Sequence, residues 1–428
     1  MVVEQQKVAQ VRPARVAFAS FVGTAIEWYD FFLFGAAATL VFNAQFFPNL
    51  SPLAGTLAAF ATFGVAFVAR PLGGIVFGHF GDRLGRKRML ILSLLLMGVG
   101  TVAIGLLPTY AQIGVAAPVL LVLVRLVQGF AVGGEWGGAV LMAVEHAPPH
   151  RRAFYGSWPQ AGVPAGLVLS AAAFLAVQQL PQDQLLSWGW RLPFLASAVL
   201  ILVGLYIRSR LEESPEFREV AAVRAVSTFP LKDTLRRSLR AVLVGVFAQA
   251  AANIPFYVVS VFVLSYGPGQ AGVSRGTLLT CLIIAALADI AAVPLVAVVA
   301  DRVGRRNVLL AGAVYSAAAA FPFFWLIDSG TSGAVLLAMF LFATVGHAMT
   351  YGAMAGFLAE LFDAEHRYTG VSLAYQVGGL ITSGPAPFLA AALFAGLGGS
   401  WAIALYIVAA CAVTVVALLL APRTEIGR

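Results

Sequence analysis

The chain has 428 residues, of which 60% are hydrophobic and only 11% are charged, and its formal net charge is +8. A soluble globular domain carries about 25% charged residues, and a domain of this length has no core large enough to hide so much apolar surface. Runs of about 20 apolar residues, each long enough to span a bilayer, recur along the chain. The composition therefore excludes a soluble domain and predicts an all-α polytopic membrane protein. Because the runs lack strict alternation, a β-barrel is excluded as well.

Twelve apolar segments fill the chain and leave no room for a separate soluble domain. They span residues 16–42, 53–77, 89–107, 115–144, 153–177, 188–207, 239–265, 274–299, 308–327, 332–361, 369–397 and 401–420. We expect a six-helix half at 1–207 and another at 239–428. The cytoplasmic linker predicted between them, 208–238, carries charges of both signs, which suits a plain linker or a short interfacial helix.

Basic residues gather in alternate loops. Of the 27 Lys and Arg residues, 23 lie in the two terminal tails and in every second loop. Because cytoplasmic loops of membrane proteins are enriched in Lys and Arg, this pattern predicts a multi-pass membrane protein with both termini in the cytoplasm. The positive net charge then reflects topology and not nucleic-acid binding.

Two motifs occur twice at nearly the same spacing. The charged turn GHFGDRLGRKR at 78–88 has a weaker copy, ADRVGRR, at 300–306, with the aspartates 219 residues apart. An acidic residue and an arginine seven positions apart follow both the fourth and the tenth segment, at an offset of 215 residues. The members of this second pair are Glu145 with Arg152 and Glu360 with Arg367. Two repeats at one offset predict an internal duplication and hence two halves in parallel relation.

The first of these motifs resembles a known family. Residues 78–87 are similar to the cytoplasmic signature of the major facilitator superfamily, and Arg125-x-x-Gln128-Gly129 resembles its arginine motif in the fourth helix. The resemblance implies the twelve-helix fold of that superfamily, in which the charged turns latch the halves together on the cytoplasmic side. It implies contacts of Asp82 with the start of the eleventh helix near Tyr368. The latch residues implied are Gly78, Asp82, Arg83, Gly85, Arg86, Glu145, Arg152, Asp301, Arg302, Arg305, Glu360 and Arg367.

Two further motifs resemble a narrower branch. The first is GTAIEWYDF at 23–31, and the second is GGEWGG at 133–138. Both look like the metabolite:proton symporters, the branch with shikimate, α-ketoglutarate, citrate and proline/betaine carriers, and the nearest likeness is to shikimate-type carriers. The resemblance implies proton-coupled import of a small polar metabolite across the bacterial inner membrane.

Seven ionisable side chains fall at membrane depth. Each costs roughly 2.5–3.5 kcal/mol at the bilayer centre by insertion scales, so each is by default a functional hypothesis. They are Glu27, Asp30, Arg70, Arg125, Glu135, Asp289 and His347. No partner for Asp289 is evident from the sequence.

Glu27 and Asp30 are three residues apart and share one helix face. Two carboxylates this close in a low dielectric do not both ionise easily, which suits a proton-coupling site. The alternative is that both pair with arginines and hold the first half together. Glu135 is a third proton-coupling candidate, and its glycine-rich surroundings also suit helix packing with a buried ion pair.

Arg70 and Arg125 are candidates for binding a substrate carboxylate through two parallel hydrogen bonds. They can equally act as counter-ions of Glu27, Asp30 or Glu135. Other residues predicted for the substrate site are Tyr29, Gln128, Gln249, Asn253, Tyr257 and His347. Three of these, on the seventh segment, recur every four residues and so form one polar stripe. His347, with Tyr351 one turn away, suits either a titrating group or a packed histidine.

The residues give no sign of an enzyme, a cofactor or a metal site. Cys281 and Cys411 both lie in apolar segments, and no nucleophile–base or metal-ligand spacing occurs. We therefore expect a proton symporter that works by alternating access on an organic hydroxy- or keto-carboxylate such as shikimate or α-ketoglutarate. Its expected partners are substrate, protons and lipid, and it would function as a monomer. The alternatives are an osmolyte (proline/betaine) symporter and a non-transporting membrane sensor.

Overall fold

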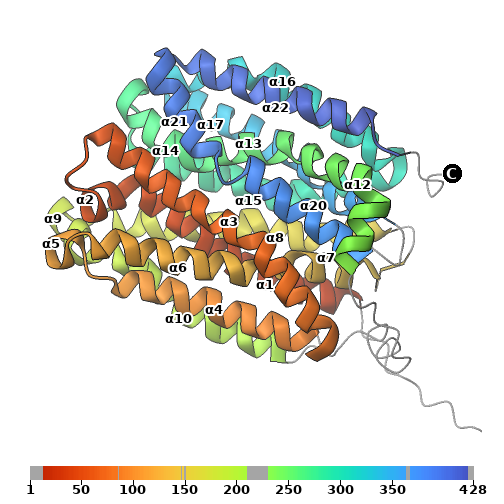
Figure 1. Ribbon diagram of the computed structural model, residues 1–428. Helices are drawn as coiled ribbons and strands as arrows, with labels where there is room; N and C mark the ends of the chain where they lie inside the picture. Colours follow the sequence, from red (N-terminus) through yellow and green to blue (C-terminus); the bar gives the residue numbers. More distant parts are fainter. Residues whose placement is uncertain are drawn as a thin grey trace, which may run out of the picture.

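The structure is a computed structural model that describes residues 13–84, 86–145, 147–148, 151–209, 230–362 and 367–422. Within this part of the chain, twelve helical spans are long and apolar enough to cross a membrane. The all-α polytopic architecture predicted from the sequence is therefore confirmed. The spans run side by side along one long axis (Figure 1).

The first six spans consist of α1 (Pro13–Ala37), η1 (Ala38–Phe42), α2 (Asn43–Phe46), α3 (Pro52–Leu84), α4 (Arg86–Leu106), α6 (Ala116–Val132), α7 (Glu135–Glu145), α8 (Arg152–Val177) and α10 (Arg191–Ser209). Short helices α5 (Tyr110–Ile113), α9 (Gln182–Gln184) and η3 (Leu185–Gly189) lie between them. In Figure 1 this set, coloured red to yellow-green, occupies the lower part of the bundle.

The last six spans begin with α12 (Pro230–Ala248), α13 (Ala250–Tyr257), η4 (Val258–Phe262), α14 (Val263–Tyr266) and η5 (Gly267–Ala271). They continue with α15 (Arg275–Val303), α16 (Arg305–Asp328), α17 (Ser332–Met339), η6 (Phe340–Gly346), α18 (His347–Tyr351) and α19 (Met354–Glu360). The final elements are α20 (Arg367–Thr382), α21 (Ala386–Leu397) and α22 (Ser400–Leu419). The η elements are π-helical, and η4 begins three residues after Pro255, whose missing amide disturbs the helical ladder.

Several predicted spans are continuous in the sequence pattern but broken in the structure. The fourth is divided into α6 and α7 at Gly133 and Gly134, and the eleventh into α20 and α21 near Pro385. Hydropathy does not reveal these breaks, because glycine and proline interrupt the helix without making the segment polar.

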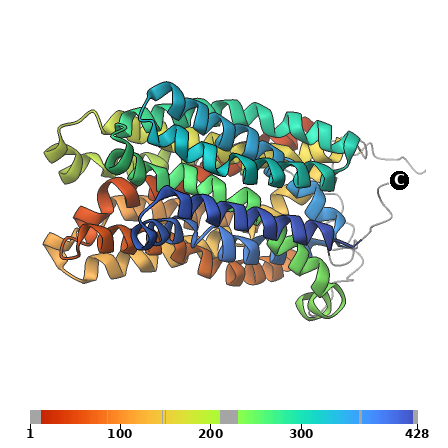
Figure 2. The same cartoon turned by 90° about the horizontal axis from the view of Figure 1, so that it is seen from above.

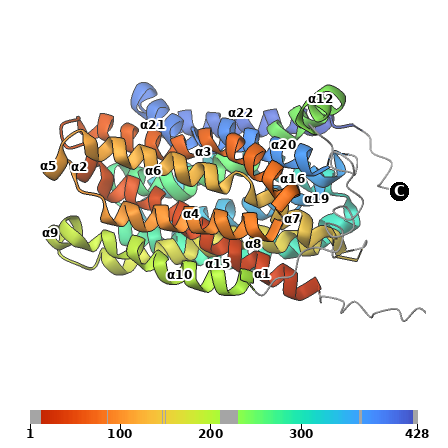
Figure 3. The same cartoon turned by 60° about the horizontal axis from the view of Figure 1, so that its bottom comes forward.

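The helices of residues 13–209 and 230–422 meet along two seams. One is formed by α8 and α15, and the other by α3 with α20 and α21. Seen from above, the spans remain close to parallel (Figure 2). The end of α22 and the start of α12 lie at the same end of the bundle (Figures 1 and 3). We call this end, which also carries the turn at Gly304, the basic end, and the opposite one the far end.

The predicted linker is shorter than expected. Helix α10 continues to Ser209, and α12 begins at Pro230 with a kink at Ser238, so both ends of the range 208–238 are helical. Figure 3 shows the first part of α12 lying across the basic end. Residues 210–229 lie outside the described part, and the division into halves at these boundaries stays a prediction.

Glycines let α3 and α6 touch through their backbones. A Cβ atom on Gly129 would lie 1.9 Å from the carbonyl oxygen of Ala66, and one on Gly133 would lie 2.0 Å from that of Arg70. Small residues four apart are the usual means of such close approach in membranes. The contact holds Arg70 on α3 at the level of the α6 break.

Gly129→Ala is expected to lower the thermal unfolding temperature of the detergent-solubilised protein, since the added methyl group overlaps the α3 backbone and overpacking costs roughly 1–3 kcal/mol. Gly138→Ala is the matched control in the same span, because a Cβ there meets no atom within 4 Å. Equal unfolding temperatures for the two variants would contradict the α3–α6 contact.

Candidate functional site

A small cavity lies between the two sets of helices, with about 20 Å³ open to the centre of a water-sized sphere. Both sets contribute to its wall. The lining residues are Trp28, Arg70 and Val163 from the first, and Asn253, Phe256, Tyr257, His347, Tyr351, Tyr375, Gly379 and Ser383 from the second. Arg70, Asn253, Tyr257 and His347 were predicted for a binding site from the sequence, and the structure brings these four together.

Arg70 is the cation on the cavity wall, and only 3% of it is exposed. Its guanidinium carbon lies 4.1 Å from the ring centre of Phe67 and 4.7 Å from that of Phe31. Among the described residues no carboxylate lies within ion-pair distance, and its Nε has no hydrogen-bond partner. The aromatic rings offer partial compensation of the charge through cation–π attraction. Arg70 thus presents hydrogen-bond donors to the cavity without an acidic partner.

Arg125 lies behind the cavity wall and is fully buried. Its Nη1 donates to Oε1 of Gln128 at 3.0 Å, and its guanidinium carbon lies 4.0 Å from the ring centre of Phe34. Gln128 in turn donates to the hydroxyl of Thr101 at 2.8 Å. Arg125 and Gln128, both predicted to bind substrate, are therefore held inside the first set of helices and do not line the cavity.

Glu27 and Asp30 lie on α1, with 5% and 2% of each residue exposed. Asp30 accepts a hydrogen bond of 2.6 Å from the Ser197 hydroxyl on α10. Glu27 has no hydrogen bond to any described residue, and Arg70 and Arg208 are the charges that act on it. Neither Arg70 nor Arg125 forms a direct ion pair with these carboxylates in this conformation, since both guanidinium groups lie over phenylalanine rings. The charge of Arg70 acts on Glu27 and that of Arg125 on Asp30 from beyond ion-pair distance.

Arg208 is a partner of Glu135 that is not evident from the sequence. The residue stands at the end of the sixth span beside the basic linker, but it is 6% exposed and forms an ion pair with Glu135. Ser93 donates a second hydrogen bond of 2.5 Å to the same carboxylate. The guanidinium reaches this depth because α1 has a glycine there: a Cβ on Gly23 would lie 3.0 Å from Nη2 of Arg208. Two features could have indicated this ion pair. One is that a buried glutamate needs a cation, and the other is the glycine of α1 that faces the sixth span.

Two other predicted substrate residues make contacts within the helix packing. The Tyr29 hydroxyl donates to the carbonyl oxygen of Pro193 at 2.7 Å. The Gln249 amide donates to the carbonyl oxygens of Gly245 and Ala374, at 2.8 and 2.9 Å. Neither residue lines the cavity. The predicted polar stripe on the seventh span therefore divides, with Gln249 in the helix contact and the next two members at the cavity.

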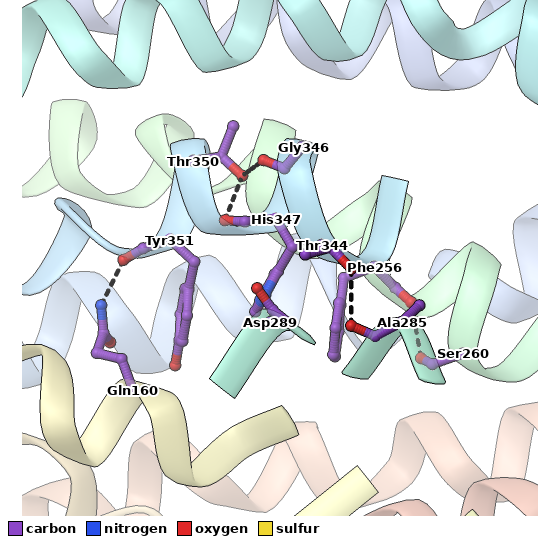
Figure 4. Close-up of polar contacts among 10 residues, drawn as sticks. All are labelled: Gln160, Phe256, Ser260, Ala285, Asp289, Thr344, Gly346, His347, Thr350 and Tyr351. Atoms are coloured by element: carbon purple, nitrogen blue, oxygen red, sulfur yellow. Dashed lines mark hydrogen bonds and ion pairs between the residues drawn. The ribbon is translucent and has the colours of Figure 1, made fainter. Parts of the chain in front are cut away.

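Asp289, for which the sequence offered no partner, is paired with His347. Its Oδ2 lies 2.6 Å from Nδ1 of the imidazole, and the aspartate is fully buried (Figure 4). The imidazole stacks between Phe256, with ring centres 4.0 Å apart, and Tyr351, at 4.8 Å. The partner was not evident because it comes from a helix 58 residues away in sequence.

An aromatic and polar chain continues from Tyr351 to the first set of helices. The hydroxyls of Tyr351 and Tyr375 are 3.1 Å apart, and Tyr375 stacks on Trp136 with ring centres 3.6 Å apart. Gln160 of α8 also donates to the carbonyl oxygen of Tyr351 (Figure 4). These contacts join the two sets of helices on the basic-end side of the cavity.

At the basic end, the copy of the charged turn contacts the opposite set of helices. Asp301 accepts hydrogen bonds from the amides of Ala153 and Phe154 at 3.3 and 3.2 Å, at the N-terminus of α8. Arg305 donates to Asp301 at 2.9 Å and pairs with Glu360. A carboxylate at a helix N-terminus is favoured by the free amides and the helix dipole.

The structure describes the side chains of only some of the other predicted latch residues. Arg152 and Arg302 are exposed to the surroundings. The side chains of Gly78, Asp82, Arg83, Gly85, Arg86, Glu145 and Arg367, and the predicted contact with Tyr368, lie outside the described residues. In the described part of the chain, no group of three or more His, Cys, Asp and Glu side chains could hold a metal ion.

Comparison with known proteins places the chain in a family. The family model described as "Major Facilitator Superfamily" matches residues 20–387 and 287–428. The chain is 42% identical over 413 residues to the "Shikimate transporter" of Escherichia coli K12, with 96% of this chain and 94% of the relative covered. It is 35% identical over 383 residues to the "Glycine betaine/proline/ectoine/pipecolic acid transporter OusA" of Dickeya dadantii, with 87% and 76% covered.

Solved structures share the fold at lower identity. The chain matches a structure of the proton:xylose symporter XylE bound to 6-bromo-6-deoxy-D-glucose with a TM-score of 0.73 and 18% identity, covering 95% of this chain and 94% of that one. The resemblance noted in the charged turns is thereby confirmed along nearly the whole chain. The protein is a membrane transporter and not an enzyme, and it belongs to the major facilitator superfamily, in the branch of the shikimate, metabolite and proline/betaine transporters.

Proposed function

We propose that this transporter is a proton-coupled symporter that imports a small organic hydroxy- or keto-carboxylate, such as shikimate or α-ketoglutarate, by alternating access of its two halves. The observation that carries the proposal is Arg70, a buried cation on the cavity wall without a carboxylate partner among the described residues. The name of a relative that shares 42% of its residues, the shikimate transporter, supports the same substrate class.

The charge on Arg70 gives the cavity a preference for anions. Removing one buried partner of a charge pair leaves the other uncompensated, which is costly in a low dielectric. In Arg70 this cost is reduced by the rings of Phe31, Phe67 and Trp28 and by the charge of Glu27, which lies beyond ion-pair distance. A substrate carboxylate can accept two parallel hydrogen bonds from the planar guanidinium and restore the balance of charge.

The rest of the lining suits a ring with hydroxyl groups. Trp28, Phe256 and Tyr375 offer flat apolar faces, while Asn253 and Ser383 offer polar groups. One cation and several aromatic faces match a monocarboxylate such as shikimate better than a dicarboxylate such as α-ketoglutarate or a tricarboxylate such as citrate, each of which would leave a carboxylate unpaired.

We assign the coupling proton to the α1 carboxylates, Asp30 first and Glu27 second. Asp30 faces the neutral hydroxyls of Ser197 and Thr101 and forms no ion pair with a described residue, and Glu27 has no hydrogen bond to a described residue. A buried carboxylate that lacks an ion pair gains a proton readily from an open aqueous side. Glu135 already has a cation and a hydroxyl donor, so we assign it to holding α7 against α10.

We propose that the basic end faces the cytoplasm, as the distribution of Lys and Arg predicts, and that Asp301, Arg305 and Glu360 latch it. The contact of Asp301 with the α8 amides closes this end, and Arg305 ties Asp301 to Glu360. The contact must break before substrate can leave there. One chain contains the cavity and both seams, so the proposed working unit is the monomer.

The runner-up is an osmolyte symporter. A relative that is 35% identical is named as a transporter of betaine and proline, and the ring faces around the cavity could attract a quaternary ammonium group. Uptake into proteoliposomes of labelled shikimate, α-ketoglutarate, citrate and betaine, with and without an inward proton gradient, separates the two. Betaine uptake with no carboxylate uptake would favour the runner-up, and uptake indifferent to the gradient would exclude symport.

Arg70→Gln is expected to raise the KM for carboxylate uptake roughly 10- to 100-fold, because a hydrogen bond to a charged group contributes about 1.5–3 kcal/mol. Arg70→Lys should fall between wild type and Arg70→Gln, since it keeps the charge but loses the planar fork. Arg275→Gln, on the exposed start of α15, is the matched control and should leave KM unchanged. An unaltered KM in Arg70→Gln would remove Arg70 from the substrate site.

Asp30→Asn is expected to abolish gradient-driven accumulation yet spare exchange of internal for external substrate. The amide still accepts from Ser197 but cannot bind and release a proton. Asp183→Asn, exposed at the far end, serves as the control. Should Asp30→Asn still accumulate substrate against a gradient, Asp30 is not the coupling residue.

Asp301→Asn is expected to open the basic end, because it weakens both the α8 cap and the pairing with Arg305. Pulsed electron paramagnetic resonance between spin labels on cysteines at positions 152 and 303, both exposed, measures this opening in a background lacking the native cysteines. The distance distribution should shift to longer values in Asp301→Asn and stay unchanged in the neighbouring control Arg302→Gln. Identical distributions in the two variants would speak against the latch.

A further inference from the structure

The pair formed by Asp289 and His347 has no task in the mechanism above. It lies in the second set of helices, between α15 and the start of α18, and the separation of Oδ2 and Nδ1 is 2.6 Å (Figure 4). Asp289 is fully buried, and its other oxygen, Oδ1, has no hydrogen-bond partner. A carboxylate buried in this way with one neutral partner is an incompletely compensated charge.

The imidazole has one nitrogen left for a ligand. Nδ1 is occupied by Asp289, and no described residue forms a hydrogen bond with Nε2. The ring is held between Phe256 and Tyr351, and His347 lines the cavity. Figure 4 shows these side chains projecting together from α18 and α13. One proton already lies between Nδ1 and Oδ2, so the next proton that the imidazole takes binds to Nε2.

We propose that Asp289 and His347 form a second proton-binding site, whose loaded form donates Nε2–H to an anionic oxygen of the substrate. A proton from the open aqueous side adds to Nε2 and gives an imidazolium, which Asp289 neutralises. The only bond that forms is Nε2–H, and it breaks when the proton leaves on the opposite side. The proposal rests on carboxylate transport as described above.

This placement puts a donor on each half around one substrate. Arg70 belongs to the first set of helices and His347 to the second, and both line the same cavity. A carboxylate or an acidic hydroxyl bound between them would draw the halves together only when the imidazole is charged. Without the proton, Nε2 is an acceptor and would repel a carboxylate oxygen.

Other groups near the pair do not titrate in the same way. The charged and titratable side chains around the cavity and along the middle of the helices packed against α18 are Glu27, Arg70, Tyr257, Tyr315, Tyr351 and Tyr375. The other charged side chains of those helices stand at the helix ends: Arg275, Asp301, Arg302, Arg305, Arg306, Asp328 and Glu360. Tyrosine has an ordinary pKa of about 10 and arginine one above 12, so neither changes charge near neutral pH. Glu27 is the remaining group, and Glu27→Gln is therefore included in the experiment.

The test measures equilibrium exchange, in which no net proton flux is required. Proteoliposomes exchange labelled shikimate, or labelled α-ketoglutarate if that is what the wild type takes up, between about pH 5.5 and 8.5, a range that spans histidine titration. The wild-type KM should rise roughly tenfold with pH, the effect of losing one charge-assisted hydrogen bond. His347→Gln should give a flat profile at the weaker value, and so should Asp289→Asn, because the imidazole without its counter-charge stays neutral.

The controls separate this site from its surroundings. Thr350→Val lies one turn from His347, and its hydroxyl bonds only within its own helix, so its profile should match the wild type. Glu27→Gln should retain the rise in KM. If His347→Gln keeps the pH dependence of the wild type, the proposal is overturned. If the wild type exchanges neither compound, the proposed substrate class fails, and the next experiment still tests the pair.

Chemical modification of the wild-type protein needs no variant and no transport. Diethyl pyrocarbonate reacts with a neutral imidazole nitrogen, and mass spectrometry of the peptide that contains His347 reports the rate. The rate should increase from about pH 5.5 to 8.5 as the imidazole loses its proton. A peptide that stays unmodified, or one modified equally fast at every pH, would show that Nε2 is not an accessible proton site.

Discussion

Every cation buried in this bundle must be compensated, and three arginines are compensated in three ways. Arg208 pairs with a carboxylate, Arg125 donates to an amide and lies against rings, and Arg70 lies against rings with the charge of Glu27 beyond ion-pair distance. Of the three, Arg70 is the one that lines the cavity. Compensation is fullest in Arg208, which serves packing, and least complete in Arg70, where a ligand can supply it. Arg70 is thus a buried cation whose charge an anionic ligand can neutralise.

The positions of these arginines depend on backbone contacts. Gly129 and Gly133 bring α3 against α6, and Gly23 leaves room for the guanidinium of Arg208. In each case the lack of a side chain on one helix leaves space for a neighbouring helix. At Gly129 and Gly133 the space is filled by the α3 backbone that carries Arg70, and at Gly23 it is filled by the Arg208 side chain. The glycine-rich motifs are therefore part of the site although they contact no ligand.

The sequence predicted the twelve spans and the buried ionisable residues, because apolar length and unexpected charge are local features. It did not predict the partners. Arg208 sits at the end of a span, where an arginine can reach toward the membrane surface or into the bundle, and only the helix packing decides. The contact of Asp289 with His347 depends on the register of two helices that are distant in sequence. Four of the predicted substrate residues, Tyr29, Arg125, Gln128 and Gln249, share polarity with the lining but point into helix contacts.

The cap on α8 has a consequence for how this protein can diverge. Asp301 contacts main-chain amides of residues 153 and 154, so the identity of those two side chains does not enter the contact. Among substitutions at these two positions only proline would delete a donor. Packing still restricts the side chains, because Ala153 is buried and Phe154 lies against Tyr155 and Trp158. The contact itself depends on one carboxylate on one side and on the backbone alone on the other, so loss of this contact by substitution should be sharply one-sided.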